Sequence, residues 1–262
     1  AAHASGRPVV VAYIHDVTTP GDKAPGGASR WWLHHSLQAL SDDLDAIGAR
    51  LWLKRGRADE IIPGLAREVQ ASAVYWNRRY EPWAIDCDSR IKSTLKDDGV
   101  EARSFNGSLL VEPWEISTKD GRPYKVYTPF WKALKARGEP AAPAPSVTTL
   151  DLYEGAPASD VLFDWNLRPT EPDWAGGLRE TWTPGEDGAK TRVSTFLQGR
   201  IDDYDDARDR PALEATSRLS PHLHHGEISP RQVWHAVKEN EGDGGLSEDA
   251  ESFLSELGWR EF

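Results

Sequence analysis

The strongest constraint on the fold is a regular alternation of short apolar runs and helical patterns over residues 7–106. Each apolar run is rich in β-branched or aromatic residues and has the length of a buried strand. Between the runs, apolar residues recur at the three- to four-residue spacing of one helix face. The runs are residues 7–16, 49–56, 71–78 and 100–106, and the helical stretches are residues 29–48, 58–70 and 88–99. This alternation predicts a parallel α/β sheet.

Residues 1–5 have the character of a helix end, although they open the sequence. A doubly wound domain normally has a strand before such a helix, so we expect the first strand of the sheet to be missing. The sequence contains no methionine, and residues 253–262 keep a helical pattern up to the last residue. We therefore expect a fragment that is truncated at both ends.

The character of the sequence changes after Phe130. Residues 138–146 are rich in proline and alanine, and few periodic runs follow them, which is typical of a connecting segment. Helical patterns then return and continue to the end, and Ser229-Pro230 is typical of an N-cap with a first-turn proline. The expected organisation is an α/β domain over 1–130, a linker over 131–188 and an all-helical region over 189–262.

The formal net charge of −11 comes from 42 acidic and 31 basic residues. Basic and acidic residues balance over 1–130, and the acidic excess lies in the second half, with dense runs at 202–209 and 239–251. Such runs are usually solvated surfaces. The composition offers no basic footprint for nucleic acid, so charge alone counts against a DNA-binding protein.

The cysteine count and the hydropathy pattern indicate the cellular setting. Cys87 is the single cysteine, which excludes an internal disulfide and favours a reducing compartment. No apolar run approaches the roughly 20 residues of a membrane span. The first residues do not follow a secretory signal pattern. We expect a cytoplasmic protein that does not contact a membrane.

Three histidines, His222, His224 and His225, stand close together in the second half. Imidazole nitrogens bind zinc and other transition metals, usually in sets that include cysteine or carboxylate ligands. No cysteine or carboxylate cluster stands at ligand spacing beside these histidines, so we expect no metal site.

A short polar segment brings three hydroxyl side chains and one guanidinium group together. They belong to Thr216, Ser217, Ser220 and Arg218. Hydroxyl groups and backbone N–H groups near a helix terminus suit a phosphate or pyrophosphate. Ordinary capping of the following helix is the alternative interpretation.

The closing segment places Glu256, Trp259 and Arg260 at the spacing of one helix face. One interpretation is an exposed salt bridge between Glu256 and Arg260 beside a packed indole. The other is a pocket wall, with an indole to stack on a flat group, a carboxylate to bond it and an arginine for an anion. The sequence contains 12 tryptophans, and they have the same two interpretations: ordinary packing, or a site where a cofactor or base stacks on an indole.

Five segments taken together resemble the DNA photolyase/cryptochrome flavoproteins. They are residues 26–40, 124–133, 196–211, 216–231 and 253–262, in the family's order and at about its spacing. Within the family, the sequence is most similar to bacterial class I-like cyclobutane pyrimidine dimer photolyases. The resemblance implies a Rossmann-like antenna domain without its first strand, a long linker and the first part of an all-helical FAD-binding domain.

The resemblance also implies roles for individual residues. The FAD side would be formed by Tyr204, Thr216, Ser217, Arg218, Leu219, Ser220, Phe253 and Arg260. Phe253 stands where tryptophan is common in the family. The side facing damaged DNA would be formed by Arg208, Glu256, Trp259 and Arg260. Glu256 and Trp259 would be the catalytic pair, because the carboxylate bonds the base edge of the dimer and the indole stacks on it.

The activity implied is light-driven repair of cyclobutane pyrimidine dimers, by electron transfer from photoexcited reduced FAD to the flipped-out dimer. The protein would then be a carbon–carbon lyase that acts on UV-damaged DNA as a monomer in the bacterial cytoplasm. These 262 residues alone are expected to be inactive and to bind FAD poorly. The alternatives are a cryptochrome, which is a blue-light photoreceptor without repair activity, and an α/β nucleotide-binding module without photochemistry.

The resemblance further implies an antenna chromophore in the first domain, either methenyltetrahydrofolate or a deazaflavin. Arg103 stands where some folate-binding members carry an acidic residue. This departure argues against folate.

Overall fold

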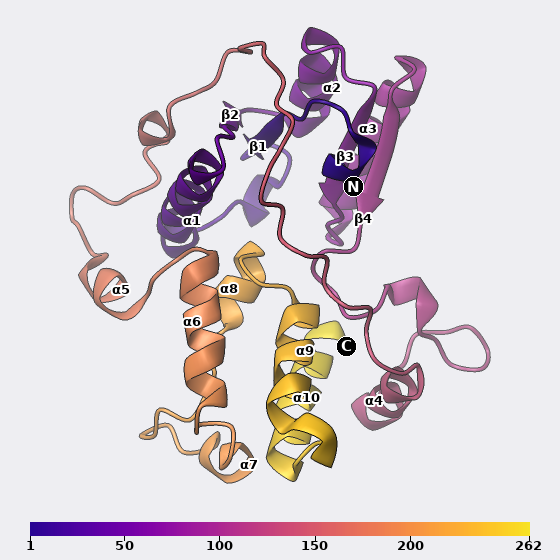
Figure 1. Cartoon of the computed structure of the whole chain (residues 1–262), viewed down its shortest axis with the longest axis vertical. Helices are drawn as coiled ribbons and strands as arrows, with labels where there is room; N and C mark the ends of the chain where they lie inside the picture. The colour runs from indigo at the N-terminus through magenta and orange to yellow at the C-terminus, as the bar shows by residue number, and fades with distance from the viewer. The chain divides into compact units, whose positions relative to one another are not determined.

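The computed structural model describes residues 1–262, except for the side chain of Asp243. The chain forms two compact units, each assembled from two separate segments (Figure 1). The α/β unit comprises Ala1–Phe105 and Ser146–Gly185, and the helical unit comprises Asn106–Pro145 and Glu186–Phe262. The division predicted from the sequence has other bounds, namely an α/β domain over 1–130, a linker over 131–188 and a helical region over 189–262.

Four short strands form two parallel pairs in the α/β unit. β1 (Val11–His15) pairs with β2 (Leu51–Arg55), and β3 (Ala73–Asn77) pairs with β4 (Glu101–Phe105). Each strand falls inside one of the four apolar runs, which confirms the predicted parallel α/β architecture. Within the described chain, no strand ladder joins one pair to the other.

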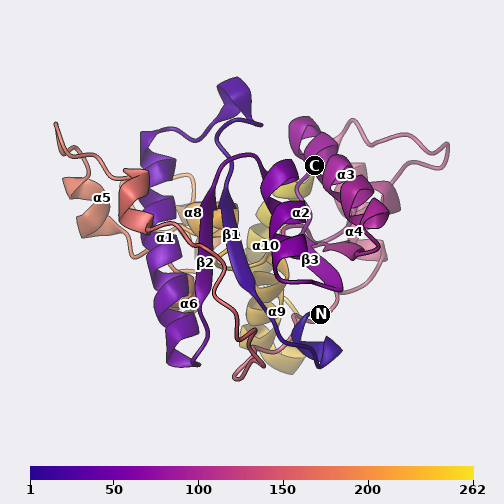
Figure 2. The same cartoon turned by 90° about the horizontal axis from the view of Figure 1, so that it is seen from above.

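A helix follows each of the first three strands, and these helices pack on both faces of the strand pairs (Figure 2). α1 (Gly27–Ala46) buries Leu33 and Leu37 against Leu51 and Leu53 of β2. The other face is covered by α2 and α3, whose buried residues pack near Ile14 of β1. Because neighbouring strand residues point to opposite faces, both faces of β1 are used. The bounds are Ala58–Glu68 for α2 and Pro82–Asp97 for α3.

Residues 146–185, expected to form part of a linker, pack along β1 and β2. The Leu53 amide donates to Ser159 Oγ at 3.0 Å, and the Arg55 amide donates to Asp160 Oδ2 at 2.8 Å. Trp165 and Leu167 are buried in the same core as α1. Single buried anchors in an irregular segment leave no helical or strand periodicity in the sequence, so the sequence alone predicted a linker here.

The helical unit is built around an aromatic core. Phe130, Trp131 and Leu134 are buried in the same cluster as Phe253 and Leu257, which explains why the segment before the proline-rich stretch belongs to this unit. Its helices are α4 (Tyr127–Ala136), α6 (Glu186–Leu197), α7 (Tyr204–Ala207), α8 (Ser220–His225), α9 (Pro230–Glu241) and α10 (Glu248–Glu261).

Ser229 caps α9 as predicted. Its hydroxyl accepts a hydrogen bond from the Gln232 amide at 3.2 Å, and Gln232 Oε1 accepts from the Ser229 amide at 2.8 Å, which completes a capping box. The remaining helices are α5 (Gly176–Thr181) and the 3₁₀ helices His3–Ser5, Gly21–Lys23, Pro113–Glu115, Leu162–Trp165 and Gly242–Gly244. Among the described residues, no helix has the length and apolar character needed to cross a membrane.

Candidate functional site

Tyr204 and Phe253, two of the predicted FAD-side residues, lie against each other in the core of the helical unit. Tyr204 opens α7 and is 6% exposed, and Phe253 on α10 is 4% exposed. Their rings meet edge to face at 5.3 Å, and the Phe196 ring of α6 lies 4.5 Å from that of Phe253. Such contacts fix ring orientations, so this aromatic trio holds α6, α7 and α10 together.

Arg208 and Glu256 form an ion pair beside the aromatic trio. Arg208 Nη1 lies 2.6 Å from Glu256 Oε1, and the guanidinium carbon lies 5.7 Å from the centroid of the Tyr204 ring. The hydrogen bond to Glu256 raises the pKa of Arg208, and burial raises the pKa of Tyr204. Two residues that were assigned separately to DNA and to the dimer are therefore one charge-assisted pair.

Trp259 presents a half-exposed indole one turn after Glu256. Its side chain is 50% exposed, and it stacks on the Tyr127 ring of α4 with centroids 3.7 Å apart and planes 10° from parallel. The Tyr127 hydroxyl donates to the Ser255 carbonyl, which anchors the supporting ring to α10. Sequence reasoning assigned no role to Tyr127, although it lies in the family-like segment 124–133.

Among the described residues Glu256 pairs with Arg208, and the salt bridge considered between Glu256 and Arg260 does not form. Arg260 Nη1 donates to the Ser108 carbonyl at 2.6 Å, and Nη2 donates to the Leu223 carbonyl at 3.5 Å. Both contacts are to backbone oxygens of the helical unit. Arg260 therefore braces the segment after Asn106 and the helix α8, and the strip of Glu256 and Trp259 does not include it.

Glu261 is a buried carboxyl group that sequence reasoning missed. Its Oε2 accepts from the Leu110 amide at 2.8 Å and from the Val111 amide at 3.4 Å. Burial raises the pKa of Glu261 to about 7, although both hydrogen bonds act in the opposite direction. The carboxyl group thus ties the end of α10 to a neighbouring loop at an electrostatic cost.

The predicted phosphate segment forms a turn that is anchored at one end. Leu219 is buried in the aromatic core, whereas the hydroxyl residues Thr216 and Ser220 are exposed. Arg218 has a left-handed backbone with φ of 55° and an ion pair with Glu214 at 3.2 Å. An exposed turn with hydroxyl groups and a guanidinium offers donors that suit an anionic phosphate.

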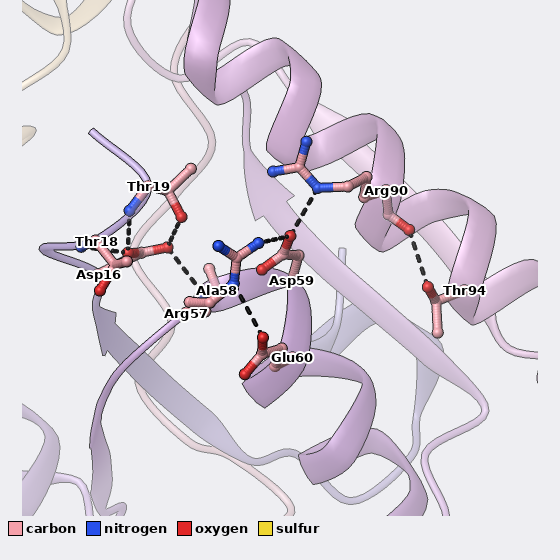
Figure 3. Close-up of polar contacts among 9 residues, drawn as sticks. All are labelled: Asp16, Thr18, Thr19, Arg57, Ala58, Asp59, Glu60, Arg90 and Thr94. Carbon is pink, nitrogen blue, oxygen red and sulfur yellow. Dashed lines mark hydrogen bonds and ion pairs between the residues drawn. The ribbon is translucent and has the colours of Figure 1, made fainter. Parts of the chain in front are cut away.

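A second polar cluster lies in the α/β unit, after β1 and at the start of α2 (Figure 3). Asp16 Oδ1 accepts from the Thr18 and Thr19 amides, and Oδ2 accepts from the Ala58 amide, each at 2.9 Å. Burial would raise the pKa of Asp16, but the hydrogen bonds from Ala58 and Thr19 outweigh it and lower the pKa. Asp16 therefore acts as a cap for the loop and for α2.

Asp59 joins α2 to α3 in the same cluster (Figure 3). Its Oδ2 lies 2.6 Å from Arg90 Nε and 2.8 Å from Arg57 Nη2, and its side chain is 7% exposed. Burial opposes ionisation, but the hydrogen bonds from Arg90 and Arg57 lower the pKa of Asp59. Asp16 and Asp59 bond to amides and arginines of the same unit, so this cluster stabilises the fold.

The three neighbouring histidines have structural partners. His222 is fully buried, with Nδ1 2.5 Å from Glu227 Oε2. Burial lowers the pKa of His225 to about 4. In the part of the chain that the structure describes, no three His, Cys, Asp or Glu residues are grouped so that they could hold a metal ion.

Comparison with known proteins gives the class of this chain. A family model described as DNA photolyase matches residues 1–146. The chain belongs to the DNA photolyase family. A solved relative superimposes on nearly the whole chain, with a TM-score of 0.92. This superposition confirms the predicted α/β fold followed by helices.

Particular relatives include both photolyases and cryptochromes. The chain is 47% identical to the deoxyribodipyrimidine photo-lyase of Agrobacterium fabrum, over all of this chain and 54% of that protein. It is 31% identical to cryptochrome-1 of Arabidopsis thaliana, over all of this chain and 40% of that protein. The chain thus spans about half the length of the curated relatives that it matches.

The solved relative is a bacterial class III photolyase from Agrobacterium tumefaciens. It is 46% identical in sequence, and the alignment covers 99% of this chain and 53% of the other. Class III is a different subgroup from the class I-like photolyases that we expected to be most similar.

Proposed function

We propose that the chain is part of a light-driven DNA repair lyase that splits cyclobutane pyrimidine dimers. The observation that carries the proposal is the half-exposed indole of Trp259, stacked on Tyr127 and placed one helical turn from the ion-paired Glu256. Family membership and 47% identity to a deoxyribodipyrimidine photo-lyase support the same assignment.

Trp259 would stack on the flipped-out dimer. Extruding a damaged base pair costs a few kcal/mol, and stacking on an aromatic side chain returns about 1–3 kcal/mol per base. Tyr127 covers one face of the indole and restrains its rotation. A preordered ring loses little conformational entropy when the dimer binds, which favours tight recognition.

Glu256 would accept hydrogen bonds from the base edge of the dimer. Arg208 holds the carboxylate in place through a single nitrogen, Nη1. A guanidinium carries five N–H donors, so Arg208 has further donors for a DNA phosphate. In this proposal Arg208 positions Glu256 and contacts the DNA backbone with one side chain.

The FAD phosphates would be held by the turn that contains Thr216, Ser217, Arg218 and Ser220, with Leu219 as its anchor. Tyr204, Phe253 and Arg260 would form the supporting wall behind the cofactor. When bound and reduced, FAD supplies the electron upon blue-light excitation. The residues of this chain bind, orient and shield the reactants.

An antenna chromophore would lie in the α/β unit, as either methenyltetrahydrofolate or a deazaflavin. Arg103 on β4 lies 3.8 Å from Glu101, and its guanidinium carbon lies 5.3 Å from the Phe105 ring centroid. This cation stands where a folate-binding site would offer an acidic group. The deazaflavin is therefore our preferred antenna.

A cryptochrome function is the second candidate, because the chain is 31% identical to cryptochrome-1 of Arabidopsis thaliana. The two functions differ in what light does to DNA. The complete protein should be reduced, mixed with UV-irradiated oligothymidine and assayed for dimers under blue light and in the dark. We expect dimer loss in the light only. A protein whose bound flavin can be reduced but which leaves the dimers intact would be a cryptochrome or a photolyase for a different lesion.

A further inference from the structure

Gly258 places inside α10 the residue that helices favour least after proline. It is buried and stands directly before Trp259. A glycine inside a helix calls for a packing reason, and its neighbours supply one. A methyl group in its place would lie 2.7 Å from the Tyr127 hydroxyl oxygen and 2.7 Å from Cε3 of Trp131. Ordinary contacts need about 3.5–4.0 Å, so these two side chains of α4 approach α10 because residue 258 has no side chain.

Tyr127 uses this close approach to span one side of α10. Its hydroxyl donates to the Ser255 carbonyl. Its ring stacks on the Trp259 indole, with centroids 3.7 Å apart and planes 10° from parallel. Ser255, Gly258 and Trp259 are spaced so that they lie on one helix face. One side chain therefore contacts α10 on both sides of Gly258.

The aromatic rings next to Gly258 form a nearly parallel series. Tyr127 and Trp131, which are four residues apart on α4, have ring centroids 6.4 Å apart and planes 11° from parallel. Trp259 continues the series on the other side of Tyr127 in the order of contacts. Trp131 is 9% exposed and Trp259 is 50% exposed, so the series runs from the core to the surface of the helical unit. The core thus holds the ring on which the exposed indole rests.

We propose that Gly258 is a positioning residue that sets the plane of Trp259 for the pyrimidine dimer, by admitting Tyr127 against one face of the indole. This inference rests on the proposed function, in which Trp259 stacks on the dimer. Aromatic rings gain stacking energy only in particular relative orientations, and a small misplacement of a recognition group is costly. A side chain at position 258 would displace Tyr127 and Trp131 and remove the support of the indole.

This role predicts a selective loss of binding. Trp259 would contact a base that has left the duplex stack, whereas undamaged DNA is held mainly through its phosphates. Displacement of the indole therefore weakens binding of dimer-containing DNA and leaves binding of undamaged DNA unchanged. A glycine that served only to keep the helical unit folded would affect both affinities together.

The test compares Gly258→Ala with Gly64→Ala in the complete protein. Both glycines lie inside helices, so alanine adds the same helix propensity at each. A side chain at position 64, however, meets nothing of the described chain within 4 Å. Affinities for dimer-containing and undamaged oligothymidine are measured by fluorescence anisotropy. Gly258→Ala should weaken binding of the damaged DNA about tenfold and leave that of the undamaged DNA unchanged, whereas Gly64→Ala should change neither.

Two variants of Tyr127 separate the ring stack from the hydroxyl anchor. Tyr127→Phe keeps a ring against the indole and should retain most of the preference for damaged DNA. Tyr127→Leu removes the stack and should reproduce the loss caused by Gly258→Ala. Fluorine NMR of protein that contains fluorotryptophan reports the surroundings of Trp259, whose signal is identified by its loss in Trp259→Phe. This signal should shift in Gly258→Ala and stay in place in Gly64→Ala.

The outcomes distinguish the positioning role from the proposed function. Equal affinities of the wild type for damaged and undamaged DNA would contradict the proposed function itself. If the wild type prefers damaged DNA, the positioning role is overturned by a Gly258→Ala variant that keeps this preference, that loses both affinities equally, or whose Trp259 signal does not shift. Circular dichroism checks the fold of each variant. Should Gly258→Ala fail to fold, Tyr127→Leu makes the same comparison, and an unchanged preference in that variant overturns the proposal.

Discussion

Asp16 and Asp59 of the α/β unit differ from Glu261 of the helical unit in the direction in which their surroundings shift the pKa. In the α/β unit, Asp16 and Asp59 receive hydrogen bonds from amides and arginines, and their pKa values are lowered. In the helical unit, burial raises the pKa of Glu261 to about 7. The first arrangement favours the ionised carboxylate and stabilises the fold. The second tolerates a poorly solvated carboxylate, as is common near functional sites.

The two units also differ in the kind of contact that these residues make. Asp16 accepts hydrogen bonds from backbone amides two and three residues onward and from the Ala58 amide at the start of α2, 42 residues away. Glu256 instead pairs with Arg208, which is 48 residues away, and Trp259 stacks on Tyr127 of another helix. Asp16 thus braces the α/β scaffold through backbone amides, whereas pairs of side chains assemble the candidate site. Three variants test this difference, in order of expected effect.

Trp259→Ala should have the largest effect, on binding of damaged DNA by the complete protein. Loss of the stacking surface is expected to weaken affinity for a dimer-containing oligonucleotide by about tenfold to a hundredfold, since stacking is worth about 1–3 kcal/mol per base. Trp174→Ala is the control, because Trp174 is 48% exposed in the α/β unit and Trp259 is 50% exposed. An equal loss of affinity in both variants would contradict the proposal that the stacking surface lies in the helical unit.

Asp16→Ala should destabilise the α/β unit by about 1 kcal/mol, the usual cost of losing a helix cap. The pKa of Asp16 is lowered in the folded state, so its contribution is present above the usual range of an aspartate and is lost as the pH falls through the folded pKa. Amide exchange at the start of α2, compared at pH 7 and at pH 3, measures this effect. The difference between wild type and variant should shrink at pH 3, and a constant difference would contradict the account.

Glu261→Gln should have the smallest effect near pH 5, and its pH dependence should be opposite to that of Asp16→Ala. Folding raises the pKa of Glu261, so its stabilising contribution is full below the unfolded pKa and is lost as the pH rises through about 7. The glutamine keeps an acceptor for the Leu110 amide but has no charge to bury. Urea unfolding should show that the variant gains stability relative to wild type between pH 5 and pH 8. A variant that loses stability over this range would contradict the assigned pKa direction.

Much of the α/β unit could be predicted because its signals are local. All four strands lie within apolar runs of the sequence. The start of α9 was predicted from Ser229, which forms a capping box there. The start of α3 was missed: the helix begins at Pro82, before the apolar periodicity that marked it from residue 88. A proline at the first helical position carries no periodic information, although it favours a helix start.

The candidate site could be predicted only in part because its contacts join distant segments. The spacing of Glu256 and Arg260 suggested a pair along one helix, but Arg208 is the partner that forms. Neither the stacking of Tyr127 on Trp259 nor the burial of Glu261 has a signature in the sequence around those residues. The same limit applies to residues 146–185, whose isolated anchors gave no sign of the core they enter.

The central claim is that Arg208 and Glu256 act as one unit in recognising the dimer, and a double-mutant cycle tests it most directly. The affinity of the complete, reduced protein should be measured for dimer-containing and undamaged oligothymidine, with wild type, Arg208→Gln, Glu256→Gln and the double variant. We predict that each single variant loses much of the preference for damaged DNA and that the double variant loses little more, because coupled residues are non-additive. Additive losses, or a double variant that keeps the wild-type preference, would contradict the account.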